Sequence, residues 1–356
     1  MTNEQWNLLR ETVAGKITSR PLTGFIIDSP WIPGWAGVTT LQYYSSEEIW
    51  FQVNKKVHET FPGIIFFPGF WSEFGMCTET SAFGAKLIWK ENALPHAGKV
   101  LENLDKVNTI KVPSPKSDGL LPFVIQRLVN YHDQILRSGH GIKFAISRGP
   151  LNIASFLLGT TELMMGFMMD PENSHRLLEK ITRFTVDWLQ YQKEIFPSIE
   201  GMLILDDIVG FVGEDECREY AVPYITRIFK AFDSDINFFH NDAQGLVSSP
   251  LLREMGVDMF NFSFEHSMKE IRELAGPEIS LVGNLPPRDV LAAGTLEKVR
   301  EETIKMVHEF GDNRRVIWSC GGGVPPDVST ENLEAFKETI DNEVPKLHYC
   351  GKVQGY

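Results

Sequence analysis

The sequence predicts a (β/α)8 barrel, and three observations lead to that fold. Eight short apolar runs occur along the chain, and segments with helical spacing of apolar residues separate them. The runs are mostly continuous and not alternating, which is typical of a parallel sheet covered on both faces. With 356 residues, 43% of them hydrophobic, the chain can form one large core. An open doubly wound sheet is the alternative, but no glycine-rich nucleotide fingerprint supports it.

The first third of the chain is the least regular part. Residues 3–14 have helical spacing and form an N-terminal extension, residues 1–20, to a single domain that spans residues 1–356. Ser46 is a plausible N-cap for a helix over residues 46–60. Three further stretches are expected to be irregular or extended: a loop rich in proline and aromatic residues, a glycine-hinged extended piece, and a surface excursion, at residues 31–44, 79–89 and 107–119.

From residue 120 onward, strands and helices alternate with little interruption. The eight predicted strands are residues 24–28, 63–67, 142–147, 201–206, 236–240, 259–263, 279–283 and 315–320. Helices are predicted over residues 120–138, 154–170, 171–196, 214–232, 247–256, 268–276, 287–311 and 330–344. Eight such units favour a closed barrel over an open sheet.

Charge and composition exclude several classes of partner. The net charge of -13 argues against nucleic acid and against anionic membrane surfaces. The four cysteines form no CxxC pair, and the first residues hold no apolar signal-like run, so a reducing cytoplasm is expected. The longest apolar stretch, residues 153–169, is interrupted at Gly159 and Gly166, which favours a buried helix over a membrane span.

Potential metal ligands follow two predicted strands. The strand at residues 236–240 ends in His240, with Asp242 two residues later, and the strand at residues 315–320 ends in Cys320. In a β/α barrel the carboxyl ends of the strands carry the chemistry. Imidazole, carboxylate and thiolate form a ligand set that zinc accepts. Taken singly, each residue has a simpler interpretation: a hydrogen-bonded histidine, a helix cap and a small core residue.

Further carboxylates lie at predicted strand ends. Asp206 and Asp207 end the fourth strand, and strand alternation directs only one of them into the barrel. That one is a candidate proton donor, a partner of His240, or an extra metal ligand; a plain turn carboxylate is the alternative. Glu79 is a weaker candidate ligand. Asn284 ends the seventh strand and is a candidate for hydrogen bonding to substrate.

Three segments resemble the uroporphyrinogen decarboxylase superfamily. They are GPLNIASFLLGTTELM, GNLPPRDVLAAGTLEKVREE and SCGGGVPPDVSTENLEAF, at residues 149–164, 283–302 and 319–336. They occur in the order that the superfamily shows after its third, seventh and last strands. The resemblance covers roughly residue 140 to the end. It implies a barrel with its active site at the carboxyl ends of the strands.

The branches of this superfamily differ at positions that can be checked here. True uroporphyrinogen decarboxylases carry an arginine-rich N-terminal segment for substrate carboxylates, whereas residues 25–37 contain no arginine. The cobalamin-dependent methyltransferase branch carries His-x-Cys and a distant Cys as zinc ligands. His240 and Cys320 match two of these positions, and Asp242 stands where the first Cys is expected. The resemblance therefore implies a zinc methyltransferase that works with the cobalamin of a separate corrinoid protein.

Substrate class is a hypothesis from ligand chemistry. A carboxylate in place of a thiolate makes zinc harder, which favours polarising an ether oxygen, as in O-demethylation of a methoxylated aromatic. Methylation of a thiol or a reduced pterin is the alternative. Aromatics after the first two strands would suit a flat apolar substrate, although ordinary packing explains many such residues: Trp31, Trp35, Phe70 and Trp71. Two further functions are alternatives. One is a metal-free decarboxylase-like lyase that uses Asp206 or Asp207, and the other is a non-enzymatic binding module.

Overall fold

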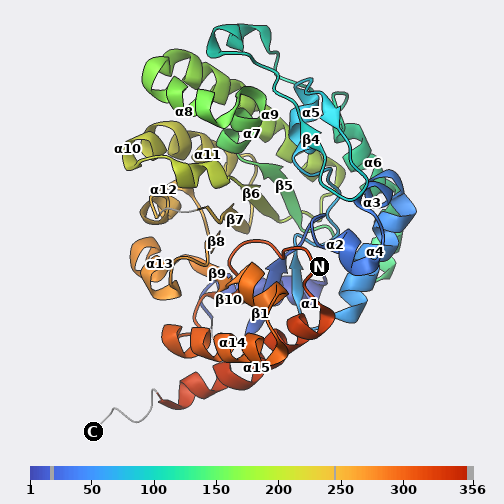
Figure 1. Ribbon diagram of the computed structural model, residues 1–356, viewed down its shortest axis with the longest axis vertical. Helices are drawn as coiled ribbons and strands as arrows, with labels where there is room; N and C mark the ends of the chain where they lie inside the picture. The colour runs from blue at the N-terminus through green and yellow to red at the C-terminus, as the bar shows by residue number, and fades with distance from the viewer. Residues whose placement is uncertain (17–19, 244–245, 351–356) are drawn as a thin grey trace.

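The structure is a parallel eight-stranded sheet curled into a barrel and surrounded by helices, as predicted (Figure 1). The computed structural model describes residues 1–16, 20–243 and 246–350, and only the backbone of the last three. The strands are β1 Leu22–Ile26, β2 Ile65–Phe67, β5 Phe144–Arg148, β6 Gly201–Leu205, β7 Ile236–Asn241, β8 Met259–Phe262, β9 Ser280–Leu285 and β10 Val316–Cys320. Each overlaps one of the eight predicted strands. Because the strands pair in parallel, their carboxyl ends share one edge, which we call the barrel mouth.

The sheet is not closed by backbone pairing. Its strand order is β2-β1-β10-β9-β8-β7-β6-β5, and within the described residues no ladder joins β2 to β5. We call this gap the seam. Gln192, from α9 Pro171–Ile195, accepts a hydrogen bond from the Ile146 N–H at 3.0 Å and donates one to the Ile146 carbonyl at 2.9 Å. Its amide thus replaces a neighbouring strand for the exposed edge of β5.

The core has two layers, one inside the barrel and one between the sheet and the helices. Inside, the Phe67 ring packs edge-on against Phe238 at 5.2 Å and Phe144 at 6.1 Å. Helix α1, Asn3–Val13, covers the amino end of this interior, because its Trp6 ring lies 5.4 Å from Phe144. The predicted N-terminal helix is therefore present, although residues 17–19 of the predicted extension lie outside the described residues.

Helices of ordinary length cover the outside of the sheet, and their ends follow local capping chemistry. Ser46 accepts a hydrogen bond from the Ile49 N–H and caps α4, as predicted, and Asp170 caps α9 in the same way. The long helices besides α1 and α9 are α4 Glu47–Thr60, α6 Leu121–Arg137, α7 Pro150–Leu158, α8 Thr160–Met169, α11 Val222–Ile228, α13 Met268–Ala275, α14 Leu296–Phe310 and α15 Thr330–Cys350.

Short elements fill the connections between strands and helices. The short α-helices are α2 Ile32–Ala36, α3 Thr40–Ser45, α5 Cys77–Ala82, α10 Glu214–Glu216 and α12 Leu252–Met255. The 3-10 and π turns are η1 Leu104–Thr109, η2 Asp207–Phe211, η3 Cys217–Ala221, η4 Ser249–Leu251 and η5 Pro287–Ala292. A small antiparallel pair, β3 Leu87–Ile88 and β4 His96–Ala97, lies outside the barrel sheet.

Three local predictions were wrong. The expected loop at residues 31–44 contains α2 and α3, and the expected extended piece at residues 79–89 begins inside α5. The apolar stretch 153–169 is two helices bent by 105°, and on α8 Met165, Met168 and Met169 are 52%, 82% and 75% exposed. Among the described residues, no single helix has the length and apolar character to cross a membrane, although the bent pair of α7 and α8 meets both criteria together.

Candidate functional site

His240 is held at the carboxyl end of β7 by a neighbour on β8. Its Nδ1 lies 2.7 Å from the Asn261 side-chain oxygen, and strand register places these two residues side by side. The Asn261 amide nitrogen donates to the carbonyls of Val282, at 2.8 Å, and Cys320, at 3.3 Å. These two bonds fix the amide, so its oxygen faces His240 and Nδ1 must carry a proton. The other nitrogen, Nε2, is left facing the barrel mouth.

Two carboxylates face this nitrogen. The His240 Nε2 lies 3.4 Å from Oδ1 of Asp207 and 3.9 Å from Oδ1 of Asp242. We call these three residues the carboxylate–histidine cluster; it is the one set of three potential metal-ligating side chains in the described residues whose ligand atoms all lie within 4.8 Å of one another. The Asp242 N–H also donates to Oδ1 of Asp207 at 3.3 Å, which holds the two acids together.

The electrostatics of the cluster are those of a cation site. Burial raises the pKa of Asp242, and the neighbouring Asp207 raises it further against the opposing influence of His240. Burial lowers the pKa of His240, but the two carboxylates and the Asn261 hydrogen bond outweigh it, so the net shift is upward. Excess negative charge around an imidazole favours any cation that occupies the space between them, a proton or a metal ion.

The spacing of the cluster also fits a small divalent ion. Zinc binds nitrogen and oxygen ligands at roughly 2.0–2.2 Å, so tetrahedral ligand atoms lie roughly 3.3–3.6 Å apart. The distance of 3.4 Å from His240 Nε2 to Asp207 Oδ1 falls in this range. The distance of 3.9 Å from Nε2 to Asp242 Oδ1 would enter it after the carboxylate oxygen moves by a few tenths of an ångström. Asp207 and Asp242 are 31% and 42% exposed in their side chains, which leaves room for that adjustment and for a further ligand.

Asp206 takes a different position from its neighbour Asp207. Its buried carboxylate accepts hydrogen bonds from the N–H groups of Leu151 and Asn152, both at 2.9 Å, in the first turn of α7. A Cβ on Gly149 would come within 2.3 Å of this carboxylate, so only glycine fits there. Of the two predicted catalytic acids, only Asp207 faces His240. Strand alternation predicts that just one of two adjacent residues faces the barrel mouth.

Cys320 does not join the carboxylate–histidine cluster in this geometry. Its thiol is fully buried and donates to the Gly322 carbonyl at 3.4 Å, and burial raises its pKa to about 12. The glycine run after it has a packing role, because a Cβ on Gly322 would lie 2.3 Å from the Asp242 carboxylate. The structure therefore brings together two of the three ligands predicted at strand ends and adds Asp207 to them.

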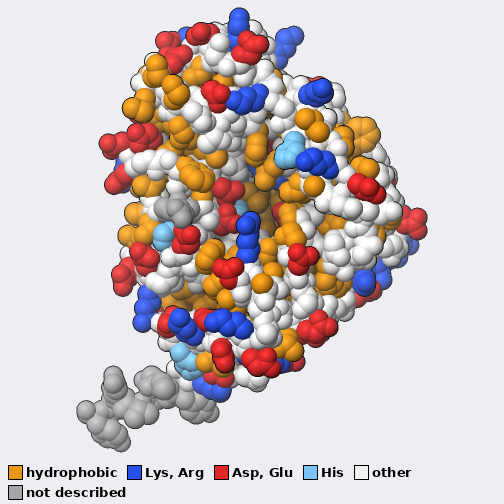
Figure 2. All heavy atoms as spheres, in the orientation of Figure 1, with side chains coloured by type: hydrophobic (Ala, Val, Ile, Leu, Met, Phe, Trp, Pro, Cys, Tyr) orange, Lys and Arg blue, Asp and Glu red, His pale blue; other side chains and the backbone are white. Residues whose placement is uncertain are grey.

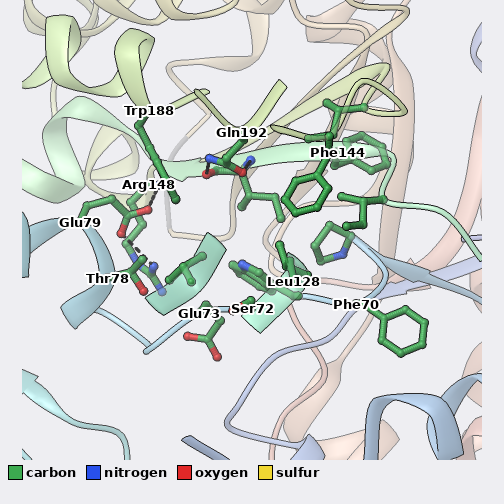
Figure 3. Close-up of a pocket in the computed structure, with 17 residues that line it drawn as sticks. Phe70, Ser72, Glu73, Thr78, Glu79, Leu128, Phe144, Arg148, Trp188 and Gln192 are labelled. Carbon is green, nitrogen blue, oxygen red and sulfur yellow. Dashed lines mark hydrogen bonds and ion pairs between the residues drawn. The ribbon is translucent and has the colours of Figure 1, made fainter. Parts of the chain in front are cut away.

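Glu79 is engaged at the seam and not with His240. Its carboxylate accepts the Arg148 backbone N–H at 3.0 Å and pairs with the Arg148 guanidinium at 3.3 Å (Figure 3). Both side chains are more than nine-tenths buried. A cavity of about 20 Å³ lies beside them, lined also by Gln192, and has room for about one water molecule. Glu79 thus completes the edge of β5 at its carboxyl end.

Asp28 follows β1 and was not selected by the sequence analysis as a site residue. Burial and the charge of Glu73 raise its pKa to about 7, against the opposing charges of Arg148 and His240. Glu73 is itself buried and accepts a short hydrogen bond from the Gly75 N–H. A polar residue at a strand end was the signal used for His240, and the same signal would have found Asp28 and Arg148, whereas Asn261 lies inside β8.

The four predicted aromatic contacts have packing partners. Trp31 is buried and donates to the Val328 carbonyl, and Trp35 donates to Thr330. Phe70 is 5.8 Å from the Phe51 ring, and the Trp71 carbonyl accepts from the Trp50 indole. Phe70 and Trp71 also line the small seam cavity. No described contact places these rings against the carboxylate–histidine cluster, so their role toward substrate stays a prediction.

Asn284 lies on the outer side of the barrel wall. Its amide donates a short hydrogen bond to the His266 carbonyl, and its backbone N–H faces the Met306 sulfur at 3.3 Å. It lines a separate surface cavity between α13 and α14 together with Lys305 and Phe310. The structure therefore separates Asn284 from the cluster, and the predicted contact with substrate stays untested.

The arrangement can bind a cation and act on a polar substrate. Acidic side chains and a histidine gather around a hollow near the middle of one face of the molecule (Figure 2). The carboxylates that face His240 come from Asp207 and Asp242, and Asp28 adds a negative charge that acts on His240 and Asp242. A metal held by His240 and two acids would keep an open position for a substrate oxygen, nitrogen or sulfur.

Comparison with known proteins gives a family and a fold. A sequence profile of the uroporphyrinogen decarboxylase (URO-D) family matches residues 35–343. Uroporphyrinogen decarboxylase from Chloroherpeton thalassium is 28% identical over 186 residues, which are 50% of this chain and 51% of that protein. The enzyme from Chlorobium luteolum is 27% identical over 187 residues, 50% of this chain and 52% of its own. The chain thus spans about half the length of these curated relatives.

Two solved structures share the architecture. A methyltransferase from Methanosarcina mazei has a TM-score of 0.78 at 16% identity, with 94% of this chain and 97% of that chain covered. A B12-independent methionine synthase from Shewanella sp. W3-18-1 has a TM-score of 0.54 at 12% identity, with 92% and 100% covered. At these identities the likeness establishes the fold alone.

Proposed function

Because the chain belongs to the uroporphyrinogen decarboxylase (URO-D) family, we propose that it is a zinc-dependent methyltransferase of this family. It would move a methyl group between a small molecule and the cobalamin of a separate corrinoid protein. The carboxylate–histidine cluster at the barrel mouth is the observation that carries this proposal. A methoxylated aromatic ether is the favoured methyl donor, and a thiol or a reduced pterin is the alternative substrate.

His240, Asp207 and Asp242 would hold the metal. Asn261 would keep the His240 ring in the tautomer that binds through Nε2, the arrangement that metal-binding histidines commonly show. When bound, zinc would act as a Lewis acid on the heteroatom that carries the methyl group. Two carboxylates and an imidazole make a harder ion than thiolates do, and a harder ion favours oxygen as its fourth ligand.

The charge of the mouth argues against decarboxylation of a porphyrinogen, the second candidate, which the curated relatives support. A substrate with many carboxylates needs arginine or lysine partners. Here Asp207 and Asp242 face His240, Asp28 adds a further negative charge that acts on His240, and the guanidinium of Arg148 is already paired with Glu79. Such a substrate would meet repulsion at each carboxylate, whereas a neutral ether would not.

Metal content is the first test. We expect about one zinc per chain in protein purified without chelator, and loss of that zinc in His240→Ala. His96→Ala is the matched control, because His96 is an exposed histidine on β4. Equal metal content in the two variants, or a wild-type protein that holds and takes up no divalent metal, would remove the proposal and favour the metal-free lyase.

Methyl transfer is the second test. Metal-loaded protein and reduced cobalamin would be incubated with 2-methoxyphenol, and methylcobalamin formation would be followed by its absorbance. The reverse assay would offer methylcobalamin to a thiol and to a reduced pterin. Activity with the ether supports the favoured substrate, and activity confined to the reverse assay assigns the alternative one. Release of carbon dioxide from a porphyrinogen, with neither transfer, would contradict both.

A further inference from the structure

The two oxygens of the Asp207 carboxylate have different neighbours. Oδ1 lies 3.4 Å from His240 Nε2 and accepts the Asp242 N–H at 3.3 Å. Oδ2 accepts a hydrogen bond from the Asn152 amide nitrogen at 3.4 Å. Asn152 lies in α7 and is 4% exposed, so the donor is a buried side chain from outside the carboxylate–histidine cluster. The cluster thus contacts one oxygen of Asp207, and α7 contacts the other.

The Asn152 amide is held in one orientation. Its oxygen accepts the Ile208 N–H at 3.3 Å, and its nitrogen donates to the Leu205 carbonyl at 3.2 Å as well as to Asp207. An amide nitrogen has two hydrogens, and these two acceptors use both. A flipped amide would place its oxygen against a carbonyl and a carboxylate, and its nitrogen against an N–H. The backbone before and after Asp207 therefore keeps a donor directed at that carboxylate.

Asp206 and Gly149 fix the helix turn that carries Asn152. The buried Asp206 carboxylate accepts the Leu151 and Asn152 N–H groups, both at 2.9 Å. A Cβ on Gly149 would lie 2.3 Å from that carboxylate, so the start of α7 can approach this closely only as glycine. The Asp206 N–H donates to the His240 carbonyl at 2.9 Å. Asp206 therefore joins the turn that carries Asn152 to the strand that carries His240.

We propose that Asn152 is a positioning residue of the metal site: it donates to one oxygen of Asp207 and so presents the other oxygen to the metal beside His240. This inference rests on the proposed function in that it requires the cluster to bind a metal. Carboxylates that bind metals are themselves hydrogen-bonded by neighbouring side chains, as metal-binding histidines are. Asn152 thus serves Asp207 as Asn261 serves His240, and Asp206 acts on the site through α7.

The expected benefit is that the ligands are arranged before the metal binds. With the Asn152 hydrogen bond, the Asp207 carboxylate keeps Oδ1 directed at the space beside His240 Nε2. Without that bond, the carboxylate can turn about its Cβ–Cγ bond, because the Asp207 side chain is 31% exposed. A ligand that must first be ordered binds the metal more weakly than one that is already in place.

Zinc affinity separates positioning from folding. In Asn152→Ala, we expect the Kd for zinc, measured by competition with a chromophoric chelator, to rise by about 10–100-fold. Asn332→Ala is the matched control, because Asn332 is 5% exposed and donates to the Leu291 and Gly294 carbonyls. It should lower the midpoint of thermal unfolding and leave the zinc affinity unchanged. Asn152→Ser, whose hydroxyl is too short to reach Asp207, repeats the test if the alanine variant does not fold. Wild-type affinity in the Asn152 variant would overturn the proposal.

A double-mutant cycle shows whether Asn152 acts through Asp207. If it does, Asn152→Ala should change the zinc affinity by less than about 2-fold in protein that already carries Asp207→Ala. The full loss on both backgrounds would overturn the proposal, because Asn152 would then act by another route.

The visible absorption of bound Co²⁺ is a second readout, because it reports the arrangement of the ligands. The Co²⁺ spectrum of Asn152→Ala should differ from that of wild type, and the spectrum of Asn332→Ala should match it. A wild-type spectrum in Asn152→Ala would contradict the positioning role.

The two proposals fail in different ways. If wild-type protein binds zinc but transfers no methyl group, the proposed function fails, and the double-mutant cycle still decides the role of Asn152. If wild type does both and Asn152→Ala matches it in zinc affinity and Co²⁺ spectrum, the function stands and the assignment of Asn152 falls. A wild-type protein that binds no divalent metal would remove both.

Discussion

Carboxylates lie on both sides of the barrel mouth, and the neighbouring backbone decides what they do. At the seam, β5 has no partner strand, so Glu79 accepts the Arg148 N–H and pairs with its guanidinium. Across the mouth, β6, β7 and β8 pair with one another in register. There the backbone is satisfied, and Asp207 and Asp242 are free to face His240. An acid becomes available for chemistry where the sheet has already met its own hydrogen-bonding needs.

The largest expected difference between the two sides is in stability. Glu79→Leu leaves the buried Arg148 charge without its partner, which should lower the free energy of unfolding by about 3–5 kcal/mol. Asp207→Asn, at the partly exposed cluster, should change it by less than about 1 kcal/mol in metal-free protein. Urea denaturation measures both. If Glu79→Leu is as stable as Asp207→Asn, the seam is not held by this ion pair.

The next difference is in metal affinity. Asn261→Leu removes the acceptor that orients His240, and loss of such a partner typically costs about 10–100-fold in affinity for the metal. Asn284→Leu, an asparagine on the next strand that contacts the His266 carbonyl, should leave the affinity near that of wild type. Competition with a chromophoric chelator reports both dissociation constants. An equal effect in the two variants would show that Asn261 acts only through folding.

A smaller effect is expected in the glycine loop. Gly322 has a positive φ of 101°, and an added Cβ would collide with Asp242. Gly322→Ala should therefore weaken zinc binding and lower the free energy of unfolding by about 1 kcal/mol or more. Gly323→Ala is the matched control, because the nearest atom to its Cβ would be 3.6 Å away. Zinc titration of the two variants decides whether Gly322 positions the ligand; equal affinities would contradict it.

The smallest expected effect is on how the free energy of unfolding changes with pH, through two buried histidines. The His58 and His140 rings lie 4.5 Å apart at an angle of 42°, and burial lowers the pKa of His58 well below its usual value and that of His140 to about 4. Folded-state pKa values below the unfolded one mean that stability is full above pH 6.5 and falls as the pH drops toward 4. His58→Phe should flatten that decline in urea denaturation at pH 7, 6 and 5. An unchanged slope would assign the decline to other groups.

Much of the barrel could be predicted because each strand is a continuous apolar run ended by a polar residue. That same ending identified His240 and Asp242, and strand alternation separated Asp206 from Asp207. The seam could not be predicted, since nothing in the local sequence shows which two strands fail to pair. The roles of Glu79 and Gln192 depend on that missing pairing. Met168 and Met169 lie in a stretch that was expected to form a buried helix, but both side chains are exposed. Hydrophobicity along the sequence does not show which face of α8 meets solvent.

Asp28 and Asn261 show a different limit. Asp28 follows the end of β1 and Asn261 lies within β8. The surroundings of both depend on residues that are distant in the chain: His240 pairs beside Asn261, and Ile26 at the end of β1 pairs with Gly323 after β10. Cys320 shows the reverse case. The spacing of ligands favoured it, yet its thiol donates inward to the Gly322 carbonyl. Contacts across the sheet, and not spacing along the chain, decide which of these side chains lie together.

X-ray absorption at the zinc edge would show whether His240, Asp207 and Asp242 bind the metal. For zinc-loaded wild-type protein, we expect about one zinc per chain with nitrogen and oxygen ligands at roughly 2.0–2.2 Å. Cys320→Ser should leave those ligands unchanged, and Asp207→Asn should alter them. Ligation dominated by sulfur at roughly 2.3 Å, or a protein that binds no zinc, would mean that this cluster is not a zinc site.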